Sequence, residues 1–237
     1  MSLIGRNHAF IGCGISCQTS HQIIGHAKQL GTAIADDLVE QSSFLNWAYI
    51  SSDDICNVVE RLLEKPITPA SIHVPQQHHA ALMLEDFNVW LWHEKPSHTV
   101  TPDDVVNIAS KYEHLRKNFA HMFEKPIKYL VVSNAQNNVT DHYPFQNGQM
   151  NVTLSGDKIN RILSSNWASG LSGHFDVFAI STKERWEGMR HGAAVIINPG
   201  ETEWKGSDDE WSRAYRHQLG IKALFRSWAT RLKANAA

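Results

Sequence analysis

Apolar residues recur along this chain in two alternating patterns, and that alternation indicates the fold. Short, continuous apolar runs are typical of buried strands and occur at 8–12, 127–132, 175–181 and 193–197. Apolar residues spaced three and four positions apart predict amphipathic helices. These helices are expected over 19–30, 55–65, 101–124, 157–167 and the C-terminal stretch from Trp211 onward. The aromatic run at 87–92 fits either a strand or a short helix.

Helix boundaries are marked by capping residues and by proline. Thr101 is a good N-cap, Pro102 suits the first helical position, and Asp103 and Asp104 favour the first turn. The acidic stretch 51–54 predicts the start of the second helix in the same way. For the first helix, Ser16 or Thr19 is the expected cap and Gly31 the expected stop.

Strands that alternate with helices predict an α/β fold with a mainly parallel sheet. We expect one domain over 1–237, in three layers, with helices on both faces of a doubly wound, Rossmann-like sheet and a long C-terminal helix. In such sheets ligands bind beyond the carboxyl ends of the strands. The loops expected there are 12–17, 133–138 and the segment from Thr182 onward.

Composition and charge exclude several classes of protein. The chain has 237 residues, 42% of them hydrophobic, which is typical of a globular protein. Its 22 Lys and Arg against 24 Asp and Glu create no field for general nucleic-acid binding. No apolar run reaches the roughly 18 residues of a membrane span. Without a recognisable export signal, and with three cysteines, we expect a cytoplasmic protein with reduced thiols.

The turn after the first strand carries the main candidate chemistry, in the segment Gly12-Cys13-Gly14-Ile15-Ser16-Cys17. A cysteine entering a helix meets free backbone N–H groups that favour the thiolate, so Cys17 is the candidate nucleophile. Gly12, Gly14 and Ser16 are then expected to contact the substrate. The alternative is that Cys13 and Cys17 are buried packing residues, as free cysteines commonly are.

A base and an amide complete this candidate site. His93 follows the apolar run 87–92 and is the candidate base, with His142 and His174 as rivals. Asn134, after the strand 127–132, is expected to orient an imidazole or hold an oxyanion, with Asn137 beside it in a substrate-binding role. The alternatives are that His93 has only a structural role and that Asn134 and Asn137 belong to an ordinary polar turn.

No metal or cofactor is expected, because neither the cysteines nor the histidines have ligand spacing. The Cys13–Cys17 pair lacks a matching second pair, and His73, His78 and His79 are more typical of a solvated loop. Gly12-Cys13-Gly14 lacks the third glycine of a dinucleotide fingerprint.

The chain resembles a bacterial family labelled papain-like cysteine peptidases. The resemblance begins with residues 10–23, which are similar to that family's opening Ser-Leu-Gly-x-x-Cys segment. It continues at Phe44-Leu45-Asn46-Trp47, His93-Glu94, the helix with Tyr112, Arg116 and Phe119, Tyr129-Leu130-Val131-Val132 and Asp209-Glu210-Trp211. Asn46 stands where the family tends to carry Asp. The resemblance implies Cys17 as nucleophile, His93 as its base and a link to surface-polysaccharide metabolism.

Gly14-Ile15-Ser16-Cys17 also resembles the start of some SGNH-type hydrolases. That resemblance would make Ser16 the nucleophile and Asn134 an oxyanion donor, but the Asp-x-x-His segment of those hydrolases is absent here.

The leading hypothesis is a hydrolase or group transferase acting on a small molecule or glycan through Cys17. Three alternatives stay open. They are a sugar-nucleotide-dependent transferase using Lys183, Arg185 and Arg190, an SGNH-type esterase, and a non-catalytic carbohydrate-binding or scaffold protein. Oligomeric state is left open by the sequence.

Overall fold

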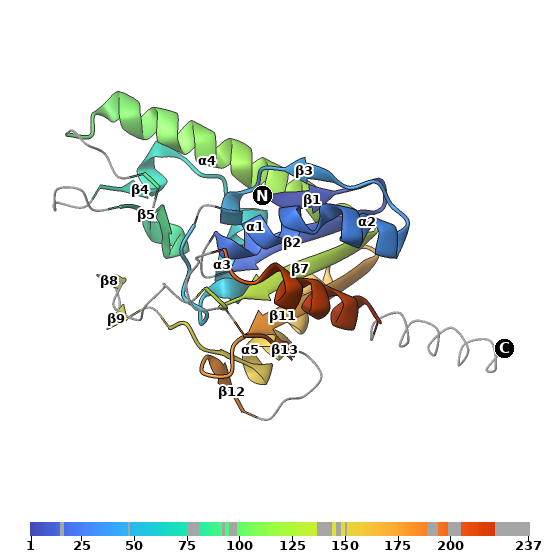
Figure 1. Ribbon diagram of the computed structural model, residues 1–237. Helices are drawn as coiled ribbons and strands as arrows, with labels where there is room; N and C mark the ends of the chain where they lie inside the picture. Colours follow the sequence, from blue (N-terminus) through green and yellow to red (C-terminus); the bar gives the residue numbers. More distant parts are fainter. Residues whose placement is uncertain are drawn as a thin grey trace.

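The structure is a computed structural model of the chain (Figure 1). It describes residues 1–14, 17–46, 48–74, 81–91, 93–94, 99–136, 144–145, 148–149, 151–188, 194–198 and 205–220.

A central sheet of six strands, mostly parallel, organises the molecule. Its strands are β1 (Ser2–Ile4), β2 (His8–Gly14), β3 (Val39–Gln41), β7 (Ile127–Ser133), β11 (His174–Ser181) and β13 (Ala194–Ile196), in the order β13-β11-β7-β2-β1-β3. β2, β7, β11 and β13 are parallel to one another, and β1 is antiparallel to both of its neighbours. The predicted mixed α/β fold with a mainly parallel sheet is therefore confirmed.

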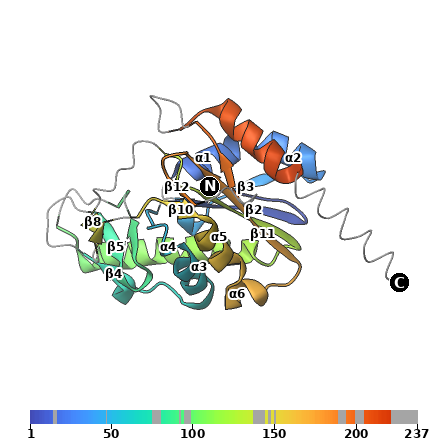
Figure 2. The same ribbon diagram turned by 90° about the horizontal axis from the view of Figure 1, so that it is seen from below.

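Helices cover both faces of this sheet (Figure 2). On one face lie α1 (Gln18–Gly25), α2 (Ala27–Ile34) and a C-terminal helix described over 208–220. On the other lie α3 (Ile55–Glu64), α4 (Pro102–Met122), α5 (Gly156–Leu163) and α6 (Asn166–Ser169). Successive residues of β7 show why both faces are covered: Leu130 and Val132 enter one apolar core, and Tyr129 and Val131 enter the other.

The remaining strands form small sheets beside the carboxyl ends of the central strands. β4 (Ile72–His73), β5 (Leu82–Leu84) and β6 (Val89–Leu91) make an antiparallel sheet. β8 (Pro144–Phe145) and β9 (Gly148–Gln149) form a hairpin, and β10 (Leu154–Ser155) pairs with β12 (Trp186–Glu187). Of the two interpretations of 87–92, a strand or a short helix, the structure shows a strand, β6, which lies outside the central sheet.

The predicted first helix is interrupted, and Gly31 does not stop it. The helix breaks at His26, and α2 continues to Ile34. Glycine is needed at position 31 because the backbone at Asp36 passes close to it, and a Cβ there would lie 2.8 Å from the Asp36 carbonyl oxygen. Cys17 occupies the N-cap position that was predicted for Ser16 or Thr19.

The predicted start of α4 is confirmed in detail. The Thr101 side chain accepts a hydrogen bond from the Asp104 N–H at 3.2 Å, and the Asp104 carboxylate accepts one from the Thr101 N–H at 2.9 Å. This reciprocal pair is a capping box, with Pro102 at the first helical position. A single predicted helix over 157–167 is instead divided into α5 and α6.

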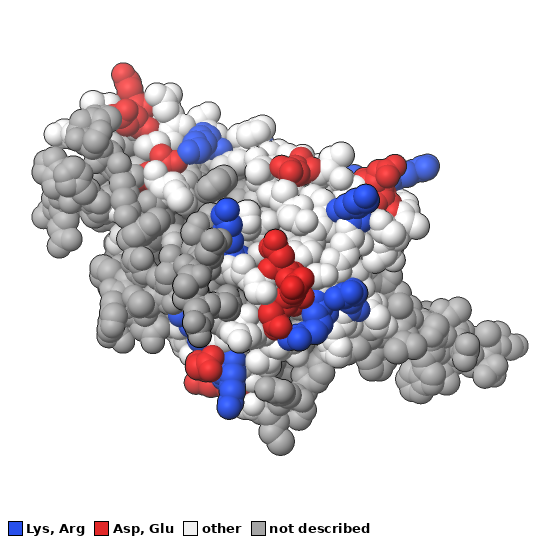
Figure 3. Space-filling view, viewed as in Figure 1, with Lys and Arg blue, Asp and Glu red and all other residues white. Residues whose placement is uncertain are grey.

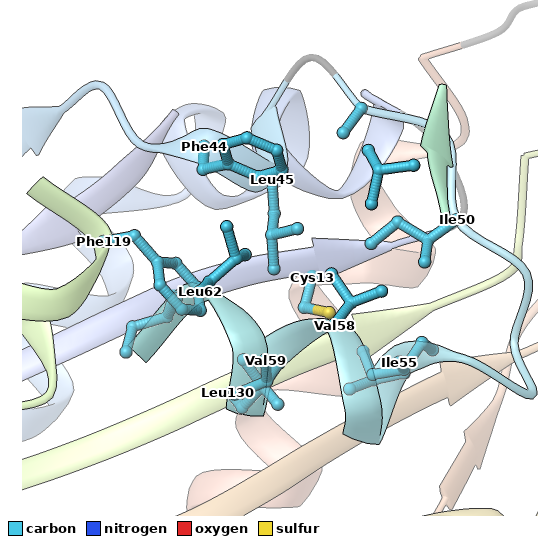
Figure 4. Close-up of a cluster of buried hydrophobic side chains, with 14 of the residues drawn as sticks. Cys13, Phe44, Leu45, Ile50, Ile55, Val58, Val59, Leu62, Phe119 and Leu130 are labelled. Atoms are coloured by element: carbon cyan, nitrogen blue, oxygen red, sulfur yellow. The ribbon is translucent and has the colours of Figure 1, made fainter. Parts of the chain in front are cut away.

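Two cysteines are core residues. Cys13 lies on β2 with no exposed surface and points among Leu45, Val58 and Ile50 (Figure 4). Cys56 is buried on α3. For Cys13 the structure therefore supports the packing interpretation rather than chemistry.

On the face shown in Figure 3, positive and negative side chains alternate in small groups. Within the described ranges, no helix combines the length and the apolar character that crossing a bilayer requires.

Candidate active site at the carboxyl edge

The carboxyl ends of β2 and β7 lie side by side, because Gly14 pairs with Ser133 in the sheet. From β2 the chain passes to α1, on one face of the sheet. From β7 it continues to α5, on the opposite face. The two connections therefore diverge at this edge, and Cys17 stands at the start of α1 beside it.

Cys17 is the one described cysteine that is partly exposed. Its backbone is helical, with φ −70° and ψ −12°, and its carbonyl accepts the first helical hydrogen bond, from the His21 N–H at 3.1 Å. Burial raises the pKa of the Cys17 thiol, and a backbone hydrogen bond offsets this only in part. The direction is opposite to the one expected at a helix N-terminus, because desolvation of the thiolate outweighs the favourable N–H groups.

The predicted substrate-binding glycines differ in their surroundings. Gly12 is buried inside β2, and a Cβ there would come within 3.2 Å of Ile23 and Ser20. Its role is to let α1 pack closely on β2, which is a packing role rather than substrate binding. Gly14 does lie at the carboxyl edge, as the last residue of β2. The two other members of the predicted set, Ser16 and Asn137, lie outside the described residues.

Asn134 is buried and holds two distant segments together. Its amide nitrogen donates to the Val152 carbonyl at 2.6 Å and to the Arg185 carbonyl at 2.9 Å. Arg185 returns a hydrogen bond to the Asn134 carbonyl at 2.9 Å. Both amide hydrogens are engaged, so in this arrangement Asn134 cannot donate to an oxyanion as predicted. It is a positioning residue that joins the loop after β7 to residues 152–185.

Gln136 contacts the start of α1 directly. Its side-chain oxygen accepts a hydrogen bond from the Gln18 backbone N–H at 3.3 Å, and both residues are buried. A second hydrogen bond, from the Arg185 guanidinium to the Gln136 carbonyl at 2.5 Å, holds the same loop. One of the N–H groups at the N-terminus of α1 is therefore already hydrogen-bonded within the protein.

His93 follows β6 and is exposed. Because β6 belongs to the sheet β4-β5-β6 and not to the central sheet, its position at a strand end does not by itself bring His93 to Cys17. The rival His174 is the first residue of β11, at the amino edge, with nearly the whole strand separating it from the carboxyl edge. At about 3.3 Å per residue that separation is roughly 20 Å. His142 lies outside the described residues.

His21 is the imidazole that follows Cys17 by one turn of α1. The two residues are one turn apart on α1, on the same face of the helix, and both are partly exposed. Burial lowers the pKa of His21, and the positive charge of Lys205 lowers it further, while Asp208 opposes the shift. Both effects favour the neutral imidazole, the form that can accept a proton. His21 is not among the bases predicted from the sequence, although its spacing of four residues from Cys17 is visible there.

Among the described residues, no group of three or more His, Cys, Asp or Glu side chains is placed to hold a metal ion. Of the predicted cations, Arg185 donates to two backbone carbonyls, Lys183 is exposed, and Arg190 lies outside the described residues.

No family model matches the chain, and no curated protein or solved structure matches it either.

Proposed function

We propose that this protein is a hydrolase or group transferase in which the Cys17 thiol attacks a small-molecule or glycan substrate at the carboxyl edge. The observation that carries the proposal is the place of Cys17, partly exposed at the start of α1 where the connections after β2 and β7 diverge. In a doubly wound sheet, to which we assign this fold, such a divergence is the point where ligands bind.

The raised pKa of Cys17 means that the thiol needs a base at neutral pH. We assign this role to His21, and keep His93 as the second candidate. In the proposed step the Cys17 sulfur forms a bond to the substrate carbonyl carbon, and the thiol proton passes to His21. Collapse of the intermediate expels the leaving group, which takes that proton, and leaves a thioester. Water or an acceptor hydroxyl then releases the acyl group and restores the thiol.

The resemblance to the papain-like cysteine peptidase family supports the choice of Cys17 as nucleophile. The same resemblance is the reason to favour a glycan-related substrate. The arrangement of the sheet supports a doubly wound fold rather than a papain fold, because the parallel strands carry helices on both faces.

The test is acetylation by p-nitrophenyl acetate, read for each cysteine by mass spectrometry. Cys17 is expected to be acetylated faster than Cys13 and Cys56, which are buried. Replacing His21→Gln is expected to lower the Cys17 rate by roughly 100-fold at pH 7, the size of a lost general base. His93→Gln is the matched variant, expected to change the rate little.

Either of two results would overturn part of this proposal. A Cys17 no more reactive than Cys13 and Cys56 would remove the nucleophile. A large loss in His93→Gln, with His21→Gln unchanged, would return the base to His93 and leave the nucleophile in place.

A further inference from the structure

A short segment beside α1, residues 205–208, brings an exposed lysine close to the start of that helix. We call this segment the strap, and it leads into the C-terminal helix, which lies beside α1 (Figure 2). The Gln22 amide nitrogen on α1 donates to the Lys205 carbonyl at 2.7 Å and to the Asp208 carboxylate at 3.1 Å. His26 adds a contact, with its Nε2 3.1 Å from the Asp208 carbonyl oxygen. The backbone of Lys205 is therefore held against α1.

The strap also packs closely on the first turn of α1. Gly206 has φ +82°, and a Cβ there would lie 3.0 Å from the Gln18 amide nitrogen and 3.1 Å from the Trp211 indole nitrogen. The left-handed backbone and the lack of space both favour glycine at this position. The strap therefore has one closely fitting position, which fixes where its lysine begins.

Lys205 consequently lies close to the candidate active site. The glycine after it packs on Gln18, the residue that follows Cys17. Its own carbonyl is bonded to Gln22, the residue that follows His21. After burial, the positive charge of Lys205 is the largest influence on the pKa of His21, which it lowers, so this charge reaches the candidate base.

The ammonium group of Lys205 is available to a ligand. The side chain is exposed, and no described residue forms an ion pair or a hydrogen bond with it. Asp208, the acid of the strap, is engaged by the Gln22 amide, and its effect on His21 is weaker than that of Lys205. The first turn of α1 contains no acidic residue that would offset the partial positive charge of the helix N-terminus. Lys205 and this end of α1 therefore both favour an anionic group.

We propose that the substrate carries an anionic group next to the carbon that Cys17 attacks, and that Lys205 binds this group. The inference rests on the proposed function, because it takes Cys17 as the nucleophile. It narrows the substrate from any small molecule or glycan to an acidic one. Lys205 is then a specificity-determining residue, since it selects the substrate by charge and takes no part in the bonds that form and break.

The test compares two alkylating reagents of nearly the same size. Iodoacetate is an anion and iodoacetamide is neutral, and each loses iodide when the thiolate attacks. Both rates at Cys17 are measured by mass spectrometry in the whole protein, and their ratio is compared with the ratio in the same protein unfolded in urea. Folding is expected to shift the ratio roughly threefold towards iodoacetate, the size of one exposed charge nearby. Added salt is expected to reduce this preference.

Variants assign the preference to Lys205. In Lys205→Met the preference for iodoacetate is expected to disappear, and in Lys205→Glu the ratio is expected to fall below that of the unfolded protein. Lys28→Met removes the same charge at an exposed position of α2 and is expected to keep the preference. Because each ratio is taken within one protein, a general change in thiol reactivity cancels.

The outcomes separate this inference from the proposed function on which it rests. If iodoacetamide modifies Cys17 but folding leaves the ratio unchanged, Lys205 does not select an anion and the proposed function stands. A preference that survives in Lys205→Met overturns the inference in the same way. If neither reagent modifies Cys17 faster than Cys13 and Cys56, the nucleophile is absent, and the proposed function fails together with the inference.

Discussion

At the amino edge of the central sheet, polar side chains close turns, whereas at the carboxyl edge a thiol and an imidazole stay partly exposed. Asp36 shows the first pattern. Its carboxylate accepts the backbone N–H groups of Arg6, Asn7 and His8 at 3.1, 2.9 and 3.1 Å, and contacts the His8 ring nitrogen at 2.8 Å. Although an open hollow of about 520 Å³ lies beside it, this carboxylate is already fully engaged.

Lys128 shows the same pattern at this edge. Its side chain is fully buried, and its ammonium group donates to the Lys125 carbonyl at 2.9 Å and also to the Ser172 carbonyl. It thereby joins the turn after α4 to the turn before β11. Next to it, Gly173 has φ +76°, and a Cβ there would lie 2.3 Å from the Pro126 carbonyl oxygen.

At the carboxyl edge the polar side chains position one another and leave reactive groups accessible. Asn134 and Arg185 hold the loop after β7, and Gln136 reaches the first N–H of α1. Cys17 and His21 remain partly exposed beside them. We infer that charged side chains with little exposure hold the turns of the amino edge together. At the carboxyl edge, where chemistry is proposed, a network of amides and backbone carbonyls supports the loops instead.

The largest loss of folding stability is expected from the substitution Lys128→Met at the amino edge. The change removes a fully buried ammonium group that donates to the Lys125 and Ser172 carbonyls, which is expected to lower the free energy of unfolding by about 3 kcal/mol. Urea denaturation measures it, with Lys28→Met, at an exposed lysine of α2, as the control. A loss below about 1 kcal/mol would mean that Lys128 does not hold this edge closed.

Asn134→Ala is the corresponding change at the carboxyl edge. Two hydrogen bonds from the buried Asn134 amide are lost, and the free energy of unfolding is expected to fall by about 2 kcal/mol. The exposed amide of Asn118, which donates to the Ser42 carbonyl at 3.0 Å, supplies the control Asn118→Ala. Equal losses in the two variants would contradict the positioning role of Asn134.

The smallest expected effect is a pH dependence at Asp36. Burial raises its pKa, but the hydrogen bonds from His8, Asn7 and Arg6 outweigh this and lower the pKa from 3.8 to about 2. Because the folded pKa lies below the unfolded value, the stabilisation is complete above about pH 4 and is lost as the pH falls through 2. The part of it lost between pH 5 and pH 3 is on the order of 1 kcal/mol.

Urea midpoints at pH 5 and pH 3 measure this contribution. The unmodified protein is expected to lose more stability over that interval than Asp36→Asn, whose side chain does not titrate there. If both proteins lose the same stability between pH 5 and pH 3, carboxylates other than Asp36 cause the acid sensitivity.

The strands of the central sheet were predictable where they are buried on both faces. The runs at 127–132 and 175–181 match β7 and β11 because parallel strands under two helical layers are continuously apolar. β1 and β3 were missed, since three residues each are too few to show a period and their antiparallel pairing forms the edge of the sheet.

The candidate site was predictable in part. The turn after β2 placed Cys17 at a helix start, and that prediction follows from local sequence. The partners of Asn134 were not predictable, because they lie 18 and 51 residues further along the chain. The raised pKa of Cys17 depends on burial by segments that its own sequence neighbourhood does not specify.

The sequence by itself determined the long strands β2, β7 and β11 and the start of α4, and that a cysteine begins α1 after a buried strand. Apolar periodicity and capping act over a few residues, so they can be read locally. Only the tertiary structure decided that β6 leaves the central sheet, that Asn134 positions rather than reacts, and that His26 meets Asp208. Those outcomes depend on which distant carbonyls come within hydrogen-bonding distance when the two apolar cores close.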